Sequence, residues 1–188
     1  TVVLEARERV GGRVENHDIG DGRVVEVGGQ WIGPTQDRLA ALAGTLGVET
    51  FPTYSQGKNV IEYRGSLRRY TGAIPRLNPL VLADFGRVEA KFKRMAKKVD
   101  PEAPWTHPDA QRLDGQTADD WIRRASMTKT GREALALCIR GVFSVEPADM
   151  SMLHWLFYIA SAGSWDDLLN TEGGAQQDRI VGGSQLIS

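Results

Sequence analysis

Apolar and polar residues repeat with two different periods along the chain. Residues 2–6 are a short, largely apolar run that includes two valines, which is typical of a buried strand in a parallel sheet. A charged, glycine-containing turn follows at residues 7–13, and residues 24–27 form a second short strand pattern that ends in Gly28 and Gly29. This pattern predicts strands joined by glycine-rich turns for the first third of the chain.

A helix and a hairpin are expected next. Thr35 is a suitable N-cap for the helix, and Gly47 is typical of a helix end. The apolar face of this helix consists of Leu39, Leu42, Ala43 and Leu46. Residues 58–63 and 67–70 then predict two strands that are joined by a turn at Gly65.

Helical periods dominate the remainder of the chain. A long amphipathic helix is expected after a break at Pro79, and Thr117 with Asp120 forms a capping-box pattern that opens another helix. A further helix is expected near residues 135–143, and residues 150–162 are apolar nearly all round, which predicts a buried helix. The first and third of these helices present Phe85, Val88, Phe92, Met95, Ala96 and Val99, and Leu135, Cys138, Ile139, Val142 and Phe143.

The composition changes near Phe51 and Pro52, and this change predicts a boundary between two domains. Residues 1–50 form part of one domain, residues 51–180 form a helical domain with one hairpin, and residues 181–188 return to the first domain. The fold class that follows is α/β. Because the opening apolar run has no preceding strand to pair with, we expect the chain to be a fragment of a larger protein.

Composition excludes several classes of protein. Hydrophobic residues make up 41% and charged residues 25% of the 188 residues, which is typical of a globular protein. The formal net charge of −1 provides no field for nucleic acid or for an anionic membrane surface. No apolar run approaches the roughly 20 residues that span a bilayer.

Cysteine and histidine give no sign of metal or nucleophilic chemistry. Cys138 is the single cysteine, so it cannot form an internal disulfide, and it fits a reducing compartment and therefore a cytoplasmic location. Its position on an apolar helix face favours a core role over a nucleophilic one. His17, His107 and His154 lie far apart and lack the spacing of metal ligands, so no metal site is expected.

Glu5 lies at the end of the opening strand pattern. An acid at this position binds the ribose hydroxyls in dinucleotide-binding βαβ units, because a carboxylate offers several acceptors to the two hydroxyl donors. The ordinary alternative is a solvated acid in a loop, since the glycine-rich phosphate loop expected roughly 20 residues earlier is absent. Glu5 alone therefore predicts little.

Gly11, Gly12 and Arg13 follow this acid closely. Glycines let backbone N–H groups approach an anion, and an arginine adds a charged fork that suits a pyrophosphate. A tight turn with solvated arginines explains the same residues. Both interpretations stay open on the residues alone.

Longer stretches carry a specific resemblance. Residues 3–13 resemble the second-strand signature of the amine oxidase superfamily of FAD enzymes, and residues 28–36 resemble its next signature, in the same order and at the same separation. The resemblance continues through residues 103–105, 144–147 and 174–179 and reaches Ser184. Within the superfamily it is closer to monoamine and putrescine oxidases than to desaturases or porphyrinogen oxidases.

This resemblance implies an FAD-binding, Rossmann-like domain that is incomplete at residues 1–50 and is rejoined at residues 181–188, with an α+β substrate domain between them. It assigns Glu5 to the adenosine ribose, and the neighbours Ala6 and Arg7 to the adenosine end. Arg7 in a packing role and Trp31 as a core aromatic are the alternatives. The remaining FAD positions, at the pyrophosphate and beside the ribityl chain and the flavin ring, are Gly11, Gly12, Arg13, Gly28, Gly29, Gln30 and Trp31.

The same resemblance implies a substrate site. Gln176 matches a glutamine that lies beside the flavin and orients the amine, and Leu169 falls where the family has an apolar gate residue. Gly141 and Val142 fall on a helix that lines the substrate cavity, where Gly141 would widen it. The family often has a second glycine where Ala175 stands, so the local backbone is expected to differ. The alternatives are a surface amide for Gln176 and core packing for Leu169 and Val142.

The activity that the resemblance implies is the oxidation of a primary amine. FAD takes a hydride equivalent from the α-carbon, water hydrolyses the resulting imine to an aldehyde and ammonia, and oxygen reoxidises the flavin to yield hydrogen peroxide. An amine and oxygen are therefore the expected small-molecule partners, and a homodimer is an assembly that the resemblance allows. A polyamine or L-amino-acid oxidase and a non-catalytic fragment are the alternatives.

Overall fold

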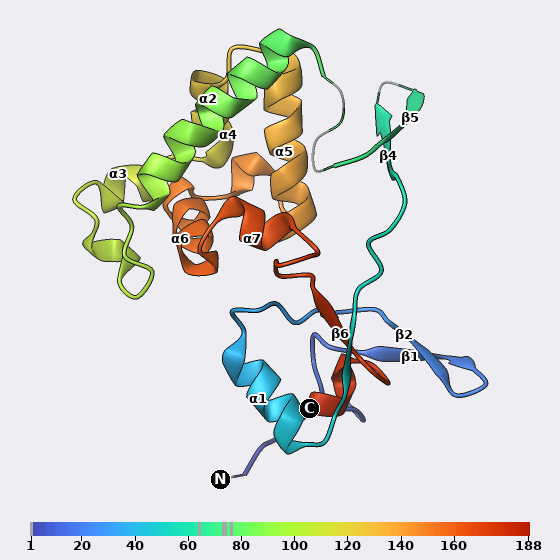
Figure 1. The fold of residues 1–188 in the computed structure, drawn as a ribbon. Coiled ribbons are helices and arrows are strands. Elements are labelled where there is room, and N and C mark those ends of the chain that lie inside the picture. The colour runs from blue at the N-terminus through green and yellow to red at the C-terminus, as the bar shows by residue number, and fades with distance from the viewer. Residues whose placement is uncertain (1, 64, 73–74, 76) are drawn as a thin grey trace. The chain divides into compact units, whose positions relative to one another are not determined.

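The computed structural model describes residues 2–63, 65–72, 75 and 77–188, and the chain divides into two compact units. The first, here called the glycine-rich unit, combines Thr1–Gln56 with Asp166–Ser188. The second, here called the helical unit, is Gly57–Trp165. Figure 1 shows strands and short helices in the first unit, and packed helices with a hairpin in the second. The chain is therefore a mixture of helix and strand.

The compact units divide the chain at different points from the predicted boundaries at 50/51 and 180/181. Strand β3 (Thr50–Pro52) pairs antiparallel with β6 (Asp178–Ile180), with Thr50 opposite Ile180. This pairing holds the segment after the predicted first boundary within the glycine-rich unit. It also draws in the residues that precede the predicted second boundary.

Two further strands of the glycine-rich unit form a hairpin. Strand β1 (Asn16–Gly20) pairs antiparallel with β2 (Arg23–Glu26). The two loop residues, Asp21 and Gly22, both have positive φ, as a tight hairpin turn requires. The predicted strand at 24–27 is confirmed as β2, whereas β1 was not predicted because its side chains are mostly polar and exposed.

The predicted strand at residues 2–6 is wrong for this structure. These residues have no regular secondary structure, and the side chains of Val2, Val3 and Leu4 are 84–92% exposed. The described strands form three two-stranded antiparallel sheets, and none of them pairs with this run. An apolar run becomes a strand only where a neighbour accepts its backbone hydrogen bonds, and no described segment does so here.

The predicted helix after residue 33 is present as α1 (Asp37–Thr45), but its expected cap is wrong. The N-cap is Gln36 rather than Thr35, and its side chain accepts a hydrogen bond from the backbone of Gly33. Of the predicted apolar face only Ala43 is fully buried. Gly47 follows the helix end with a φ of 67°, as predicted.

The helical unit begins with the predicted hairpin, which is confirmed as β4 (Asn59–Tyr63) and β5 (Ser66–Tyr70). The predicted long helix is α2 (Pro79–Ala96), and its N-cap Asn78 accepts a hydrogen bond from Leu80. The predicted capping box at Thr117 opens α4, and Thr128 caps α5. The other elements here are η1 (Pro104–Thr106), α3 (Ala110–Asp114), α4 (Ala118–Ala125), α5 (Lys129–Phe143), η2 (Pro147–Asp149) and α6 (Met152–Ala162).

Two further elements complete the chain. Helix α7 (Trp165–Leu169) starts on the last residue of the helical unit, and η3 (Ser184–Ile187) lies in the glycine-rich unit. Within the described residues, no helix is both long enough and apolar enough to cross a bilayer.

Four aromatic rings form the core of the helical unit. Phe92 of α2 lies 4.3 Å from Trp155 of α6 and 5.7 Å from Trp121 of α4, measured between ring centroids. Trp165 stacks on Phe92 at 5.9 Å. The predicted burial of α6 holds on this side only, because His154 and Tyr158 are exposed on the opposite side. His154 therefore lies outside the packed core, although the sequence pattern of residues 150–162 predicts burial nearly all round the helix.

A buried carboxylate joins α2 to the start of α5. The side chain of Asp84 is 1% exposed and accepts hydrogen bonds from Ser126 Oγ, Met127 N and both the backbone and the hydroxyl of Thr128. Arg87 completes the cluster at 2.8 Å. Burial alone would raise the pKa of Asp84, but the hydrogen bonds from Ser126, Thr128, Arg87 and Met127 outweigh it and hold this pKa well below its usual range.

Asp84→Asn should destabilise the protein by at least about 2 kcal/mol at neutral pH, because the amide nitrogen cannot accept these hydrogen bonds. The folded-state pKa of Asp84 is depressed, so its contribution is complete above the ordinary aspartate pKa and declines as the pH falls below it. The difference in unfolding free energy between wild type and variant should therefore narrow as the pH falls from about 5 to about 2. Denaturant titrations at several pH values measure this difference, with Asp149→Asn, at an exposed aspartate, as the control. A constant difference would contradict the assignment.

Candidate functional site

The segment Gly28 to Gly33 runs between two other segments of the glycine-rich unit. On one side, a Cβ at Gly28 would lie 2.1 Å from the carbonyl oxygen of Arg13, and Gly29 N donates to that oxygen at 3.1 Å. On the other side, a Cβ at Gly33 would lie 2.7 Å from Ala175 Cα. The structure therefore places Arg13 beside Gly28 at one end of this segment, and Ala175, the neighbour of Gln176, beside Gly33 at its other end.

Backbone hydrogen bonds set the register of this arrangement. Ile32 N donates to Asp178 O at 2.8 Å, and Asp178 N donates to Ile32 O at 3.0 Å. Trp31 therefore precedes the bridge residue Ile32 by one position. Gln176 precedes the bridge partner, Asp178, by two positions. The predicted reason for a glycine at position 28 was close approach to a flat ring, whereas the structure shows close approach to Arg13.

Arg9 organises the predicted pyrophosphate loop. Its guanidinium donates to Gly12 O at 3.2 Å and pairs with Glu15 Oε2 at 2.7 Å. Sequence reasoning assigned Arg9 no role, because an arginine in a charged turn is usually solvated. The sequence alone does not indicate this ion pair, because it is the turn that brings Arg9 close to Glu15, six residues later.

Gly12 and Arg13, in contrast, keep hydrogen-bond donors that the described residues do not use. Their backbone N–H groups and the Arg13 guanidinium have no hydrogen-bond acceptor among the described residues. No atom lies within 4 Å of the position that a Gly12 Cβ would occupy. Unused donors beside an open glycine fit a pyrophosphate, which requires N–H groups and a cation that can approach it closely.

Glu5, Ala6 and Arg7 lie exposed on the irregular opening segment. Glu5 Oε1 accepts a hydrogen bond from Arg7 N at 2.9 Å, and this backbone hydrogen bond lowers the pKa of Glu5. An ionised, exposed carboxylate is what a ribose diol would meet. Arg7 is exposed within the described residues, and its place at the adenosine end stays a prediction.

Gln30 is half-buried and Trp31 is 40% exposed. Trp31 is thus not buried by the described residues, and its place beside the flavin stays a prediction. Its exposed indole leaves a large apolar surface next to the Ile32–Asp178 bridge.

The Gln176 turn separates two adjacent glutamines. Gln177 Oε1 accepts from Gly173 N at 3.1 Å, and its Nε2 donates to Asp178 Oδ2 at 2.9 Å. The backbone N–H of Gln176 donates to Asn170 O at 3.4 Å, whereas its side-chain amide makes no hydrogen bond to any other described residue. Ala175 N donates to Asp167 O at 2.6 Å, which closes the turn without a second glycine. Sequence reasoning missed the structural role of Gln177 and expected it to tolerate replacement.

The other predicted substrate residues lie in different units. Gly141 and Val142 are on α5 of the helical unit; Gly141 is exposed, with open space where a Cβ would lie, and Val142 is half-buried. Leu169 ends α7 in the glycine-rich unit and is 39% exposed. That these residues line one cavity with Gln176 stays a prediction.

Comparison with known proteins identifies the family to which the chain is similar. The family model for flavin-containing amine oxidoreductases matches residues 1–188. The chain is 43% identical over 187 residues to the Mycobacterium tuberculosis protein AofH, named as a flavin-containing monoamine oxidase. It is 34% identical over 191 residues to the flavin-containing amine oxidase A of Bos taurus. Each alignment covers the whole chain, but only 41% and 36% of these two relatives, so the chain spans about two fifths of their length.

Solved structures give the same result. A wild-type putrescine oxidase bound to putrescine matches with a TM-score of 0.87 and 34% identity. The cyclohexylamine oxidase of Brevibacterium oxydans matches with a TM-score of 0.89 and 26% identity. Both matches cover 97% of this chain and 41% of the other chain.

Gly28→Ala should destabilise the protein by about 1–3 kcal/mol, because its Cβ would collide with the backbone of Arg13. Gly44→Ala is the matched control. Gly44 lies inside α1 with open space around it, so the same change should stabilise by about 0.5–1 kcal/mol. Denaturant midpoints of both variants in the full-length protein measure the contrast. Equal midpoints would show that the Gly28 contact is not tight.

Proposed function

This chain belongs to the flavin-containing amine oxidoreductase family, and from that membership we propose that the full-length protein binds FAD and oxidises a primary amine. The observation that carries the proposal is the meeting of three segments in the glycine-rich unit. These segments carry the unused donors at Gly12 and Arg13 and the exposed Trp31. They also carry the side-chain amide of Gln176, which makes no hydrogen bond to the described residues.

The FAD part of the proposal uses the opening half of this unit. Glu5 would bind the adenosine ribose, with Ala6 and Arg7 beside the adenosine. Gly12 and Arg13 would bind the pyrophosphate through N–H groups and a guanidinium. The residues from Gly28 to Trp31 would then pass beside the flavin, within a Rossmann-like domain that the rest of the protein completes.

The substrate part of the proposal rests on Gln176. An amide offers both a donor and an acceptor, so it can orient a neutral amine without charging it. We propose that Leu169, Gly141 and Val142 line the same cavity. The open space around Gly141 supports this assignment, because no neighbouring atom requires a glycine there.

Bound FAD would supply the redox chemistry by accepting a hydride from the α-carbon of the amine and by passing both electrons to oxygen. In total, a primary amine, oxygen and water give an aldehyde, ammonia and hydrogen peroxide. The described residues contribute binding and orientation to this reaction. A cytoplasmic location and a homodimer stay predictions.

Glu5→Ala should weaken FAD binding to the full-length apoprotein by about tenfold or more, because a charge-assisted hydrogen bond to the ribose is lost. Quenching of flavin fluorescence in a titration measures this affinity. Glu8→Ala removes an exposed carboxylate from the same turn and should leave the affinity unchanged. Identical affinities for both variants would remove Glu5 from the site.

Gln176→Ala should lower kcat/KM for a primary amine by about tenfold to a hundredfold while FAD stays bound, because the substrate loses its orientation. Gln177→Ala should instead lower the melting temperature, since it removes the two side-chain hydrogen bonds that Gln177 contributes to the turn. Peroxide release and thermal unfolding of each variant separate the two roles. Wild-type kinetics for Gln176→Ala would contradict its place in the substrate site.

A further inference from the structure

Glu26 is the residue at which three segments of the glycine-rich unit meet. It ends β2, two residues before Gly28, and its side chain is 2% exposed. Its Oε2 accepts from Arg179 Nη2 at 2.6 Å and from Arg179 Nε at 3.1 Å. Its Oε1 accepts from Ser184 N at 2.7 Å and from the Ser184 hydroxyl. One carboxylate oxygen therefore accepts hydrogen bonds from β6, and the other accepts hydrogen bonds from the turn that follows β6.

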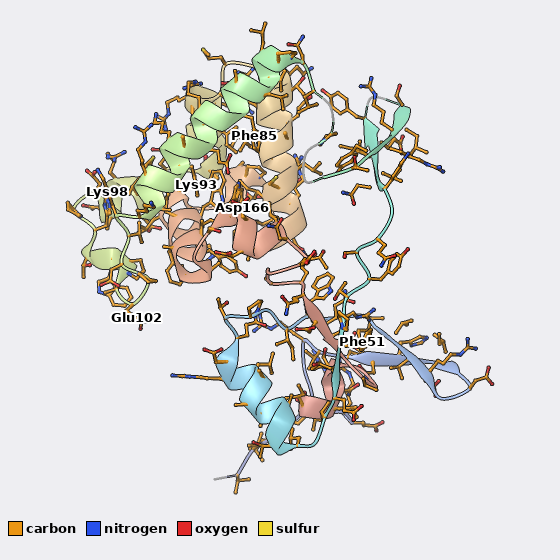
Figure 2. All side chains as sticks on the ribbon, in the orientation of Figure 1. Phe51, Phe85, Lys93, Lys98, Glu102 and Asp166 are labelled. Atoms are coloured by element: carbon orange, nitrogen blue, oxygen red, sulfur yellow. The ribbon has the colours of Figure 1, made fainter. Side chains whose placement is uncertain are left out.

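The partners of Glu26 are themselves held in place. Arg179 lies opposite Phe51 in the β3–β6 ladder, and its guanidinium lies over the Phe51 ring at 5.9 Å. Figure 2 labels Phe51 next to β6. Asn16, the ladder partner of Glu26, donates to Gly182 O at 2.7 Å, which fixes the turn before Ser184 from the other strand.

The charge on Glu26 is maintained by these contacts. Burial alone would raise the pKa of Glu26, but the hydrogen bonds from Ser184 and the Arg179 guanidinium outweigh burial and leave this pKa below its usual value. A buried carboxylate that loses one such partner keeps an uncompensated charge, so both ends of the ion pair are needed together.

The position of this ion pair along the chain links it to the site. Glu26 is followed directly by the segment Gly28 to Trp31, and Arg179 follows Asp178, the bridge partner of Ile32. The ion pair and the bridge thus join the same two segments at two points, which are adjacent on one segment (Asp178 and Arg179) and six residues apart on the other (Glu26 and Ile32). Movement at either point would change the spacing between Trp31 and Gln176.

We infer that Glu26 and Arg179 are positioning residues for amine oxidation, and that their ion pair sets the spacing between the flavin-facing segment and the Gln176 turn. This inference rests on the proposed function. Neither residue was singled out from the sequence, because an acid at a strand end and an arginine before a glycine turn are both usually solvated.

The test compares Glu26→Gln, Arg179→Met and the double variant in the full-length enzyme. Each single variant should weaken FAD binding to the apoprotein and lower kcat by about tenfold or more, the size expected for loss of one charge-assisted hydrogen bond, with a smaller change in KM. The visible circular dichroism of bound flavin should change at temperatures where the variants remain folded. The double variant should be no worse than the more damaged single variant, because both changes break the same pair.

Two controls sharpen the result. Asp21→Asn breaks the exposed Asp21–Arg23 ion pair in the same unit, whose side chains are 85% and 67% exposed, and should change none of these quantities. Arg179→Lys keeps the charge but not the second donor, so it should retain more FAD affinity than Arg179→Met. It also carries the test if Glu26→Gln does not fold.

Folded variants with wild-type FAD affinity and wild-type flavin circular dichroism, but lower melting temperatures, would overturn the inference and leave the proposed function standing. Additive effects in the double variant would also overturn it. A wild-type full-length protein that binds no FAD would overturn the proposed function and this inference together.

Discussion

Two backbone hydrogen bonds between Ile32 and Asp178 are the constraint on which the glycine-rich unit depends. The segment before Ile32 carries the flavin candidates, and the segment before Asp178 carries Gln176. Such pairing requires the two backbones to approach closely, which explains Gly33 beside Ala175. Gly28 permits a second close approach, to the backbone of Arg13. The β3–β6 ladder and the Glu26–Arg179 ion pair then continue the same junction.

Each compact unit uses one buried carboxylate as a junction. Asp84 joins α2 to the start of α5, and Glu26 joins β2 to β6 and to the following turn. In both cases several donors converge on two oxygens, so the burial of the charge is offset. The difference lies in what stands next to the junction. Asp84 adjoins helix ends, whereas Glu26 adjoins the segments to which the family resemblance assigns cofactor and substrate.

Local signals in the sequence predicted the helical unit well. The apolar period placed α2, α5 and α6, the Thr117 capping box placed the start of α4, and the turn at Gly65 placed the hairpin. These features depend on residues a few positions apart, so the sequence displays them directly. The failures depend on distant partners. The run at residues 2–6 has no paired neighbour in the described chain, and β1 is recognisable only by its pairing with β2.

The candidate site shows the same division. The blocks around Gly11 and Gly28 could be identified from the sequence, and their contact through Arg13 could not, because no local pattern encodes it. Arg9 and Glu26 were missed for a similar reason. A charged residue is read as solvated until the acceptors that surround it are known, and those acceptors lie at the far end of a turn or of the chain.

The two glutamines after Ala175 look like a simple repeat, but their side chains have different structural roles. Gln177 satisfies the backbone of its own turn, so acceptable replacements at that position are decided by the fold. The Gln176 side chain makes no hydrogen bond within the described residues, and only its backbone N–H contributes to the turn, by donating to Asn170 O. The shape of the turn and the amide that it presents are therefore encoded by separate side chains, so a change at position 176 leaves the side-chain hydrogen bonds of Gln177 intact.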